Sequence, residues 1–189
     1  MKRLPFLTLT TLIALACQRS EANPMNPDPS TALENDSSQL ARHTSCYDAD
    51  EWTCEVEAAI ARLTNEKRGR APALDLLFES SKVARQHSQK MVREGISHEG
   101  FQSRGEEIKR ELPGVKIVLL GENVAQFSNR LEDPEAIAKE FVRMWWNSAG
   151  HRQNIENSQY TYIGVGVARA DSGIYATQIF HSDKLPSGK

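Results

Sequence analysis

The sequence predicts an α+β domain in which helices cover an antiparallel sheet. Three observations support this fold class. Apolar residues recur at helical spacing in the first half of the domain, one short run rich in β-branched residues lies mid-chain, and two alternating runs flank a turn near the C-terminus. Helices followed by a strand and a hairpin are typical of α+β proteins, because the apolar face of a sheet needs a covering layer.

Composition indicates one ordinary globular domain. The chain has 189 residues, of which 39% are hydrophobic and 25% charged, and its formal net charge is −2. These values are typical of soluble folded proteins. Basic residues are scattered among acidic ones rather than gathered in a patch, so we expect no nucleic-acid partner.

The N-terminus resembles a targeting segment rather than part of the domain. Lys2 and Arg3 precede an apolar stretch, Leu4 to Ala16, which is too short to span a bilayer. Small residues before Cys17 resemble a bacterial lipobox, although Leu15 lies one place later than the usual leucine. We therefore predict a lipoprotein signal peptide over residues 1–17, with a lipid anchor on Cys17. The alternative is an ordinary signal peptide that is cleaved elsewhere.

A polar segment follows, and the folded domain is expected over residues 46–185. Residues 18–45 are rich in Asn, Pro, Ser, Asp and Glu without an apolar period, which predicts a flexible linker. Gln18, not an aspartate, follows the cysteine. By resemblance to proteobacterial sorting, this favours a lipoprotein of the outer membrane or cell surface.

Two cysteines, Cys46 and Cys54, remain if Cys17 carries lipid. Export makes a disulfide between them plausible, and it would close a small loop ahead of the first helix. The alternative is a pair of free thiols. A cysteine zinc site is disfavoured, because the spacing is not CxxC and there is no second cysteine pair.

Periodicity and stop signals predict helices before a mid-chain strand. The helices that we expect are Glu55–Arg68, Asp75–Glu94, Arg104–Leu112 and Asp133–Ser148. Gly95 and Gly150 are read as helix stops. His87 falls on an apolar stripe and is interpreted as a core histidine. The apolar run Val115–Leu120 predicts a buried strand between the third and fourth helices.

The C-terminal part predicts a hairpin. Two alternating runs flank the turn triplet Asp171-Ser172-Gly173. Gly164 and Gly166 leave one face of the first strand nearly bare, so another element is expected to pack closely against its backbone.

Three ionisable residues are predicted to follow breaks in regular structure. His98 follows Gly95, Glu122 comes directly after the predicted strand, and His151 follows Gly150. Two imidazoles and a carboxylate are able to bind a divalent metal such as zinc. They are equally able to form an acid/base cluster. A purely structural role for each histidine stays open, because nothing local brings them together.

Several segments resemble the CAP superfamily of cysteine-rich secretory, antigen 5 and pathogenesis-related proteins, and its bacterial SCP-like branch in particular. The resemblance covers about Val56 to Phe180 and rests on the segments LTNEKR, ARQHSQKM, SHEG, GENVA, WWNSAGHRQNI and YTYIGVGVA. It implies a three-layer α-β-α sandwich and a surface cleft lined by two histidines and two acids. His98, Glu122 and His151 match three of these positions, while the fourth falls on Ser148.

Three functions are compatible with this resemblance. The first is an exported, membrane-tethered domain that binds a lipid or an envelope partner at His98, Glu122 and His151. The second is a metal-dependent hydrolase that uses the same residues, with Glu122 as base or ligand. The third is a structural adaptor of the cell envelope. The sequence supplies no activated nucleophile, because it has no serine elbow and no free cysteine if Cys46 and Cys54 are paired. A metal-dependent reaction would not need one, so whether the chain is an enzyme stays open.

Overall fold

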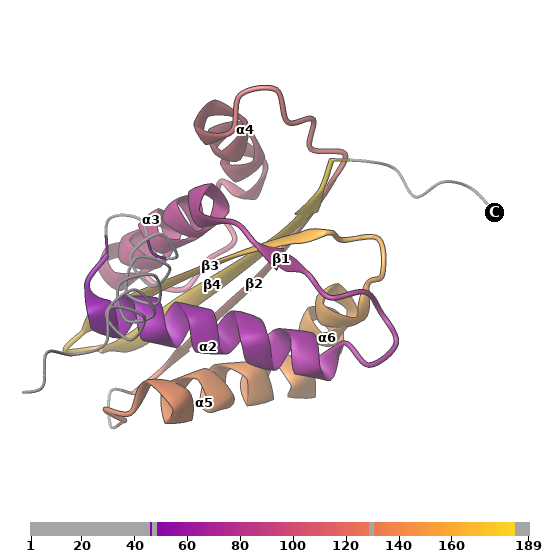
Figure 1. Ribbon diagram of the computed structural model, residues 1–189. Coiled ribbons are helices and arrows are strands. Elements are labelled where there is room, and N and C mark those ends of the chain that lie inside the picture. Colours follow the sequence, from indigo (N-terminus) through magenta and orange to yellow (C-terminus); the bar gives the residue numbers. More distant parts are fainter. Residues whose placement is uncertain (1–45, 47–48, 129–130, 184–189) are drawn as a thin grey trace, which may run out of the picture.

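The computed structural model describes residues 46, 49–128 and 131–183 and has three layers (Figure 1). Cys17 and the predicted linker 18–45 lie outside these residues. The helices are α2 (Glu51–Lys67), α3 (Phe78–Glu94), α4 (Phe101–Glu111), α5 (Pro134–Asn147) and α6 (Ala149–Glu156). The strands are β1 (Asp75–Leu76), β2 (Leu119–Phe127), β3 (Tyr162–Ala170) and β4 (Gly173–Ser182). In the described part of the chain, no helix is long and apolar enough to cross a membrane.

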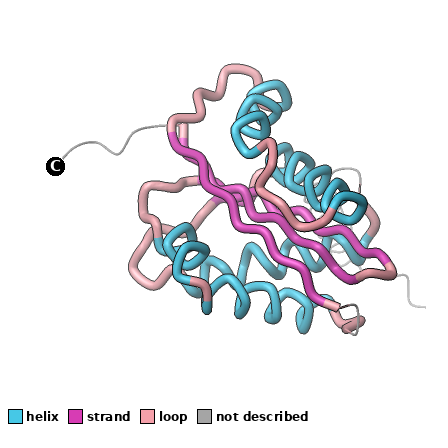
Figure 2. The backbone as a smooth tube through the Cα atoms, turned by 180° about the vertical axis from the view of Figure 1, so that it is seen from behind, coloured by secondary structure: helices cyan, strands magenta, loops and turns pink. Residues whose placement is uncertain are grey.

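The sheet lies between two helical layers, which confirms the predicted α-β-α sandwich. Its strand order is β1-β3-β4-β2. The three long strands are antiparallel, as predicted, whereas the short β1 pairs in parallel with β3. Helices α3 and α4 cover one face, and α2, α5 and α6 cover the other (Figures 1 and 2). The central strand β4 is therefore buried along its whole length.

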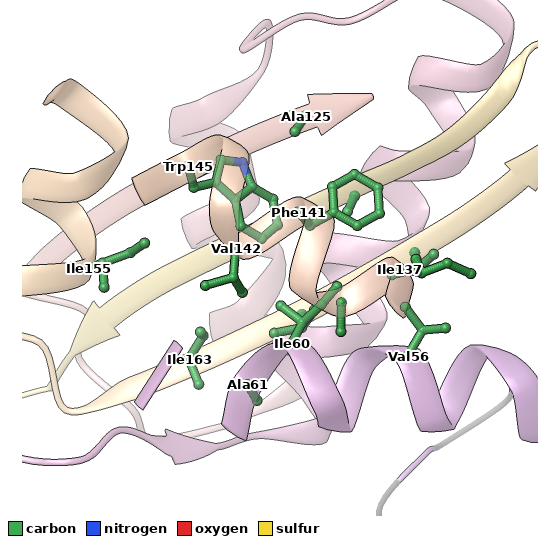
Figure 3. Close-up of a cluster of buried hydrophobic side chains, with 14 of the residues drawn as sticks. Val56, Ile60, Ala61, Ala125, Ile137, Phe141, Val142, Trp145, Ile155 and Ile163 are labelled. Atoms are coloured by element: carbon green, nitrogen blue, oxygen red, sulfur yellow. The ribbon is translucent and has the colours of Figure 1, made fainter. Parts of the chain in front are cut away.

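The larger core lies between the sheet and the pair α2 and α5 (Figure 3). Val56 and Ile60 of α2 meet Phe141 and Trp145 of α5, and all four side chains are fully buried. Their spacing of four residues places them on one face of each helix. Burial of these side chains is the main force that holds both helices on the sheet.

The opposite face of the sheet lets α3 approach unusually closely. A Cβ atom added at Gly166 would lie 1.9 Å from the backbone nitrogen of Arg85, and one at Gly164 would lie 2.4 Å from the carbonyl carbon of Ser80. Ser88 Oγ donates a hydrogen bond of 2.8 Å to the Gly166 carbonyl. The predicted close packing against these glycines is thus confirmed.

The predicted disulfide between Cys46 and Cys54 is confirmed, with a Cα–Cα distance of 5.2 Å. Its predicted position ahead of the first helix is wrong. Helix α2 begins at Glu51, because Asp50 caps it by accepting a hydrogen bond from the backbone nitrogen of Thr53. Cys54 therefore lies in the first turn of α2, and the bridge attaches Cys46 to the helix itself.

The predicted mid-chain strand is wrong in position. Strand β2 runs from Leu119 to Phe127, where all nine residues pair with β4, so it begins four residues later than predicted and extends further. The interior of β2 contains Glu122 and Asn123, which are polar but buried. The prediction relied on an apolar run, so it did not include them in the strand. Glu122 is thus part of the strand rather than following it.

Other helix boundaries also differ from prediction, and α4 begins at Phe101, three residues before the predicted Arg104. Asp75 and Leu76 form β1 beside β3, so α3 begins only at Phe78. Gly150 does not end a helical region: the chain turns at Ser148 and continues at once as α6. His151 consequently lies in the first turn of a helix, not in a loop.

Candidate functional site

The structure brings His98, Glu122 and His151 together from three elements. His98 lies in the loop between α3 and α4, Glu122 in β2, and His151 in the first turn of α6. The Nδ1 atom of His98 is 2.8 Å from Glu122 Oε1. The ring centroids of His98 and His151 are 6.4 Å apart. These three residues, together with Arg104, are called the His98 cluster below.

Arg104 is a member of this cluster that the sequence analysis missed. It comes from α4, and its Nη2 donates a 2.7 Å hydrogen bond to Glu122 Oε1 while its Nε contacts Oε2. Arg104 is 5% exposed and Glu122 6%. The spacing along α4 could have indicated this residue. Arg104 precedes the buried Ile108 by four residues, which places it on the inward face of α4.

Arg104 also organises the loop that presents His98. Its Nη1 donates to the Glu99 carbonyl at 2.8 Å, and its Nη2 donates to the His98 carbonyl at 3.3 Å. One buried guanidinium thus holds both the loop backbone and the carboxylate that orients the imidazole. Such two-sided hydrogen bonding suits the planar donor fork of arginine.

The hydrogen bonds assign the open nitrogen of His98. A carboxylate accepts hydrogen bonds, so the proton of the neutral imidazole lies on Nδ1 and Nε2 carries the free lone pair. The His98 side chain is 54% exposed, so this nitrogen is accessible. Burial, and then the nearby His98, lower the pKa of His151 below the ordinary histidine value. At neutral pH His151 therefore offers a neutral imidazole nitrogen.

Amide side chains fix α6 against β2. Asn123 Nδ2 donates to the His151 carbonyl at 3.1 Å, and Asn154 Nδ2 donates to the Glu122 carbonyl at 3.1 Å and to Asn123 Oδ1 at 2.9 Å. The guanidinium of Arg152 lies 5.9 Å from the centroid of the Trp146 ring. These amides hold His151 beside the strand that carries Glu122.

Ser148 lies at the corner between α5 and α6, three residues before His151. A serine at this corner supplies no fourth carboxylate. Among residues 46, 49–128 and 131–183, no three or more His, Cys, Asp or Glu side chains are arranged to hold a metal ion. Tetrahedral zinc would bring two imidazole centroids to about 5 Å from each other. The centroids of His98 and His151 are 6.4 Å apart, so the two rings would have to approach each other to share a metal ion, with Glu122 as the outer partner that orients His98.

A separate pocket of about 480 Å³ lies at the start of α2, and none of the cluster residues lines it. Its walls include Trp52, Arg85 and Arg169. Arg85 binds Glu57 through two hydrogen bonds, and the Arg169 guanidinium lies 3.9 Å from the centroid of the Trp52 ring. Because these groups already have partners, the pocket is not the candidate site.

Residues 51–180 match the model of the cysteine-rich secretory protein family, CAP. The chain belongs to this family. The prediction from the sequence motifs is therefore confirmed, and the CAP match falls inside the predicted domain 46–185.

Similar proteins include bacterial members of the family. The Bacillus subtilis protein YkwD is 33% identical over 127 residues, which are 66% of this chain and 46% of YkwD. An extracellular Bacillus anthracis protein containing an SCP domain is 31% identical in structural alignment, with a TM-score of 0.52, over 67% of this chain and 40% of that one. This chain therefore spans less than half the length of these two relatives.

An outer surface protein of Borrelia burgdorferi shares the fold. Its TM-score is 0.54 at 19% identity, and the alignment covers 67% of this chain and 92% of the Borrelia chain. The likeness at this identity concerns the fold alone.

Proposed function

We propose that this chain is an exported CAP domain of the cell envelope, tethered to a membrane, that binds a ligand at the His98 cluster without turning it over. The environment of Glu122 carries this proposal. Both carboxylate oxygens of Glu122 already accept hydrogen bonds from Arg104, and one of them also accepts from His98. A carboxylate enclosed in this way is poorly placed to remove a proton from a substrate.

The ligand meets the imidazoles rather than the carboxylate. His98 Nε2 is accessible, and the lowered pKa of His151 favours its neutral form. Imidazole nitrogens accept hydrogen bonds from a lipid headgroup or an envelope partner, and they also coordinate a divalent metal ion that such a ligand carries. The extracellular Bacillus anthracis relative supports an exported location.

Zinc titration of the domain tests the shared site. We expect the imidazole NMR signals of His98 and His151 to shift together, with weaker binding at acidic pH because protonated imidazoles do not coordinate metal. His151→Gln should weaken binding by at least ~10-fold, the loss typical of removing even an outer-shell partner. Glu156→Gln, an exposed change on the same helix, is the matched control and should bind zinc like the wild type.

The outcomes separate the candidate functions. Joint shifts, or co-purified lipid that is lost in His151→Gln, support binding at the cluster. A shift of only one ring, with no bound lipid or partner, would overturn the proposal and leave the structural adaptor.

A metal-dependent hydrolase is the second candidate, and the hydrogen bond between His98 and Glu122 favours it. A carboxylate that orients a metal-binding imidazole is common in zinc sites. Catalytic zinc sites usually have three protein ligands and one open position. Only two imidazoles of the His98 cluster are placed to coordinate, so we expect zinc-loaded protein to hydrolyse ester and peptide substrates no faster than free zinc.

The tether is tested separately. Cys17→Ser should release the full chain from the membrane fraction, because the acyl chains on this cysteine supply the anchor. Cys17 precedes the CAP match at residues 51–180, so the change does not alter the sequence of the matched domain. The measurement is the distribution of protein between the membrane pellet and the supernatant. A variant that pellets like the wild type would contradict the anchor.

A further inference from the structure

A second histidine, His87, lies beneath the loop that presents His98. It belongs to α3 and is 4% exposed. Its Nε2 lies 2.8 Å from the Ser97 carbonyl oxygen, and its Nδ1 lies 3.3 Å from Arg104 Nη1. A carbonyl only accepts and a guanidinium only donates. Both contacts are satisfied only when His87 is neutral and carries its proton on Nε2.

His87 and Arg104 together hold three consecutive carbonyl groups of the loop. His87 binds the carbonyl of Ser97, while Arg104 binds those of His98 and Glu99. The loop itself adds the short-range bonds Glu99 N to Ser97 Oγ at 2.9 Å and Phe101 N to His98 O at 3.1 Å. The position of the His98 backbone therefore depends on two buried side chains that touch each other.

We propose that His87 is an acid-sensitive latch: its protonation breaks the contact with Arg104 and releases the Ser97–Glu99 segment that presents His98. A second proton on Nδ1 would point at the guanidinium, which has no lone pair to accept it. Two cations would then lie 3.3 Å apart in a nearly buried place. Moving Arg104 away to relieve this repulsion loosens its bonds to the loop carbonyls. The inference rests on the proposed function, since it assigns regulation to the same binding site.

The surroundings of His87 keep the latch closed at neutral pH. Arg104 from α4 and Lys90 from α3 oppose its protonation, whereas Glu122 from β2 favours it; the loop presents the neutral Ser97 carbonyl. Burial is the largest cause that lowers the pKa of His87, followed by Arg104. A lowered pKa means that the neutral contacts stabilise the fold above the ordinary histidine pKa of about 6.5 and are lost as the pH falls below it. The latch is thus closed at neutral pH.

Hydrogen exchange of the loop amides, measured without metal or ligand, tests the latch. Between about pH 7.5 and pH 5, the protection factors of the Glu99 and Phe101 amides should fall by at least ~10-fold, because protonation of His87 removes the contacts that hold the loop. The amide of Gly95, which bonds to the Met91 carbonyl at the end of α3, should stay protected.

His87→Gln is the decisive variant. A glutamine amide can donate to Ser97 and accept from Arg104, yet it does not titrate. Its loop should therefore stay equally protected at both pH values. His98→Gln, which keeps His87, should retain the acid response of the wild type.

Two results would overturn the latch. One is wild-type loop protection that does not change with pH. The other is a His87→Gln variant that loses protection in acid as the wild type does. If His87→Gln fails to fold, the ring ¹⁵N shifts of wild-type His87 must titrate together with loop release for the latch to stand. Because no ligand takes part, failure of the latch is distinguishable from failure of ligand binding at the cluster.

Discussion

Acidification from about pH 7 to about pH 4 is expected to lower the free energy of unfolding by about 3 kcal/mol through His181 alone. The ring of His181 lies in the central strand β4 and is fully buried. Its Nε2 lies 2.8 Å from Ser80 Oγ, and the centroid of its ring lies 5.2 Å from the centroid of the Tyr162 ring. Its Nδ1 has no hydrogen-bond partner among the described residues.

The direction of the effect follows from proton uptake. Burial lowers the pKa of His181 to about 4, and Asp183 opposes this only in part. In the unfolded chain an ordinary histidine takes up its proton near pH 6.5, as is typical of model peptides. Between these pH values the unfolded state binds more protons, so stability falls as the pH falls. A difference of about 2.5 between the two pKa values corresponds to about 3 kcal/mol.

Urea unfolding at both pH values measures this contribution. At neutral pH, His181→Gln should have a lower free energy of unfolding than the wild type. On acidification, its free energy of unfolding should fall by about 3 kcal/mol less than that of the wild type. Ser80→Ala is the matched control, because it removes the hydrogen bond and keeps the imidazole. It should lose about 1 kcal/mol at neutral pH and keep most of the acid response. An undiminished acid response in His181→Gln would show that other groups cause it.

Apolar periodicity was enough to predict the parts of the fold that bury one clear face. Helices α2 and α5 and the hairpin of β3 and β4 were predicted because their apolar residues recur at the period of each element. Strand β2 was misplaced because buried Glu122 and Asn123 interrupt its apolar run, and their partners come from α4 and α6. Such tertiary partners are invisible to local patterns.

The candidate site shows the same limit. The argument that each site residue follows a break in regular structure was wrong for Glu122, which lies within β2, and for His151, which lies within α6. Their association was predicted from the family motifs instead. Arg104 was missed because its contact with Glu122 joins a helix to a strand 18 residues away. The spacing from Ile108 indicates that Arg104 lies on the inward face of α4, but the local pattern does not reveal its carboxylate partner.

Gly166→Ala is expected to lower the free energy of unfolding by about 3 kcal/mol or more, the upper range for an overpacked core. The added methyl group would lie 1.9 Å from the backbone nitrogen of Arg85 and 2.2 Å from the carbonyl carbon of Ala84. Both contacts are with the backbone of α3, so no side-chain rotation can relieve them. The helix must move away from β3 and break the hydrogen bond from Ser88 to the Gly166 carbonyl.

Gly150→Ala separates this collision from a general effect of replacing glycine. Gly150 lies in α6, and no atom lies within 4 Å of the position that its Cβ would occupy. Alanine favours the helix over glycine by up to about 1 kcal/mol, so this variant should be as stable as the wild type or more stable. Urea unfolding of both variants at neutral pH gives the comparison. Equal stabilities for Gly166→Ala and the wild type would show that α3 is not held against β3 at this distance.

The loop that presents His98 begins where α3 ends, so a displaced α3 in Gly166→Ala should also lower the protection of the Phe101 amide from hydrogen exchange.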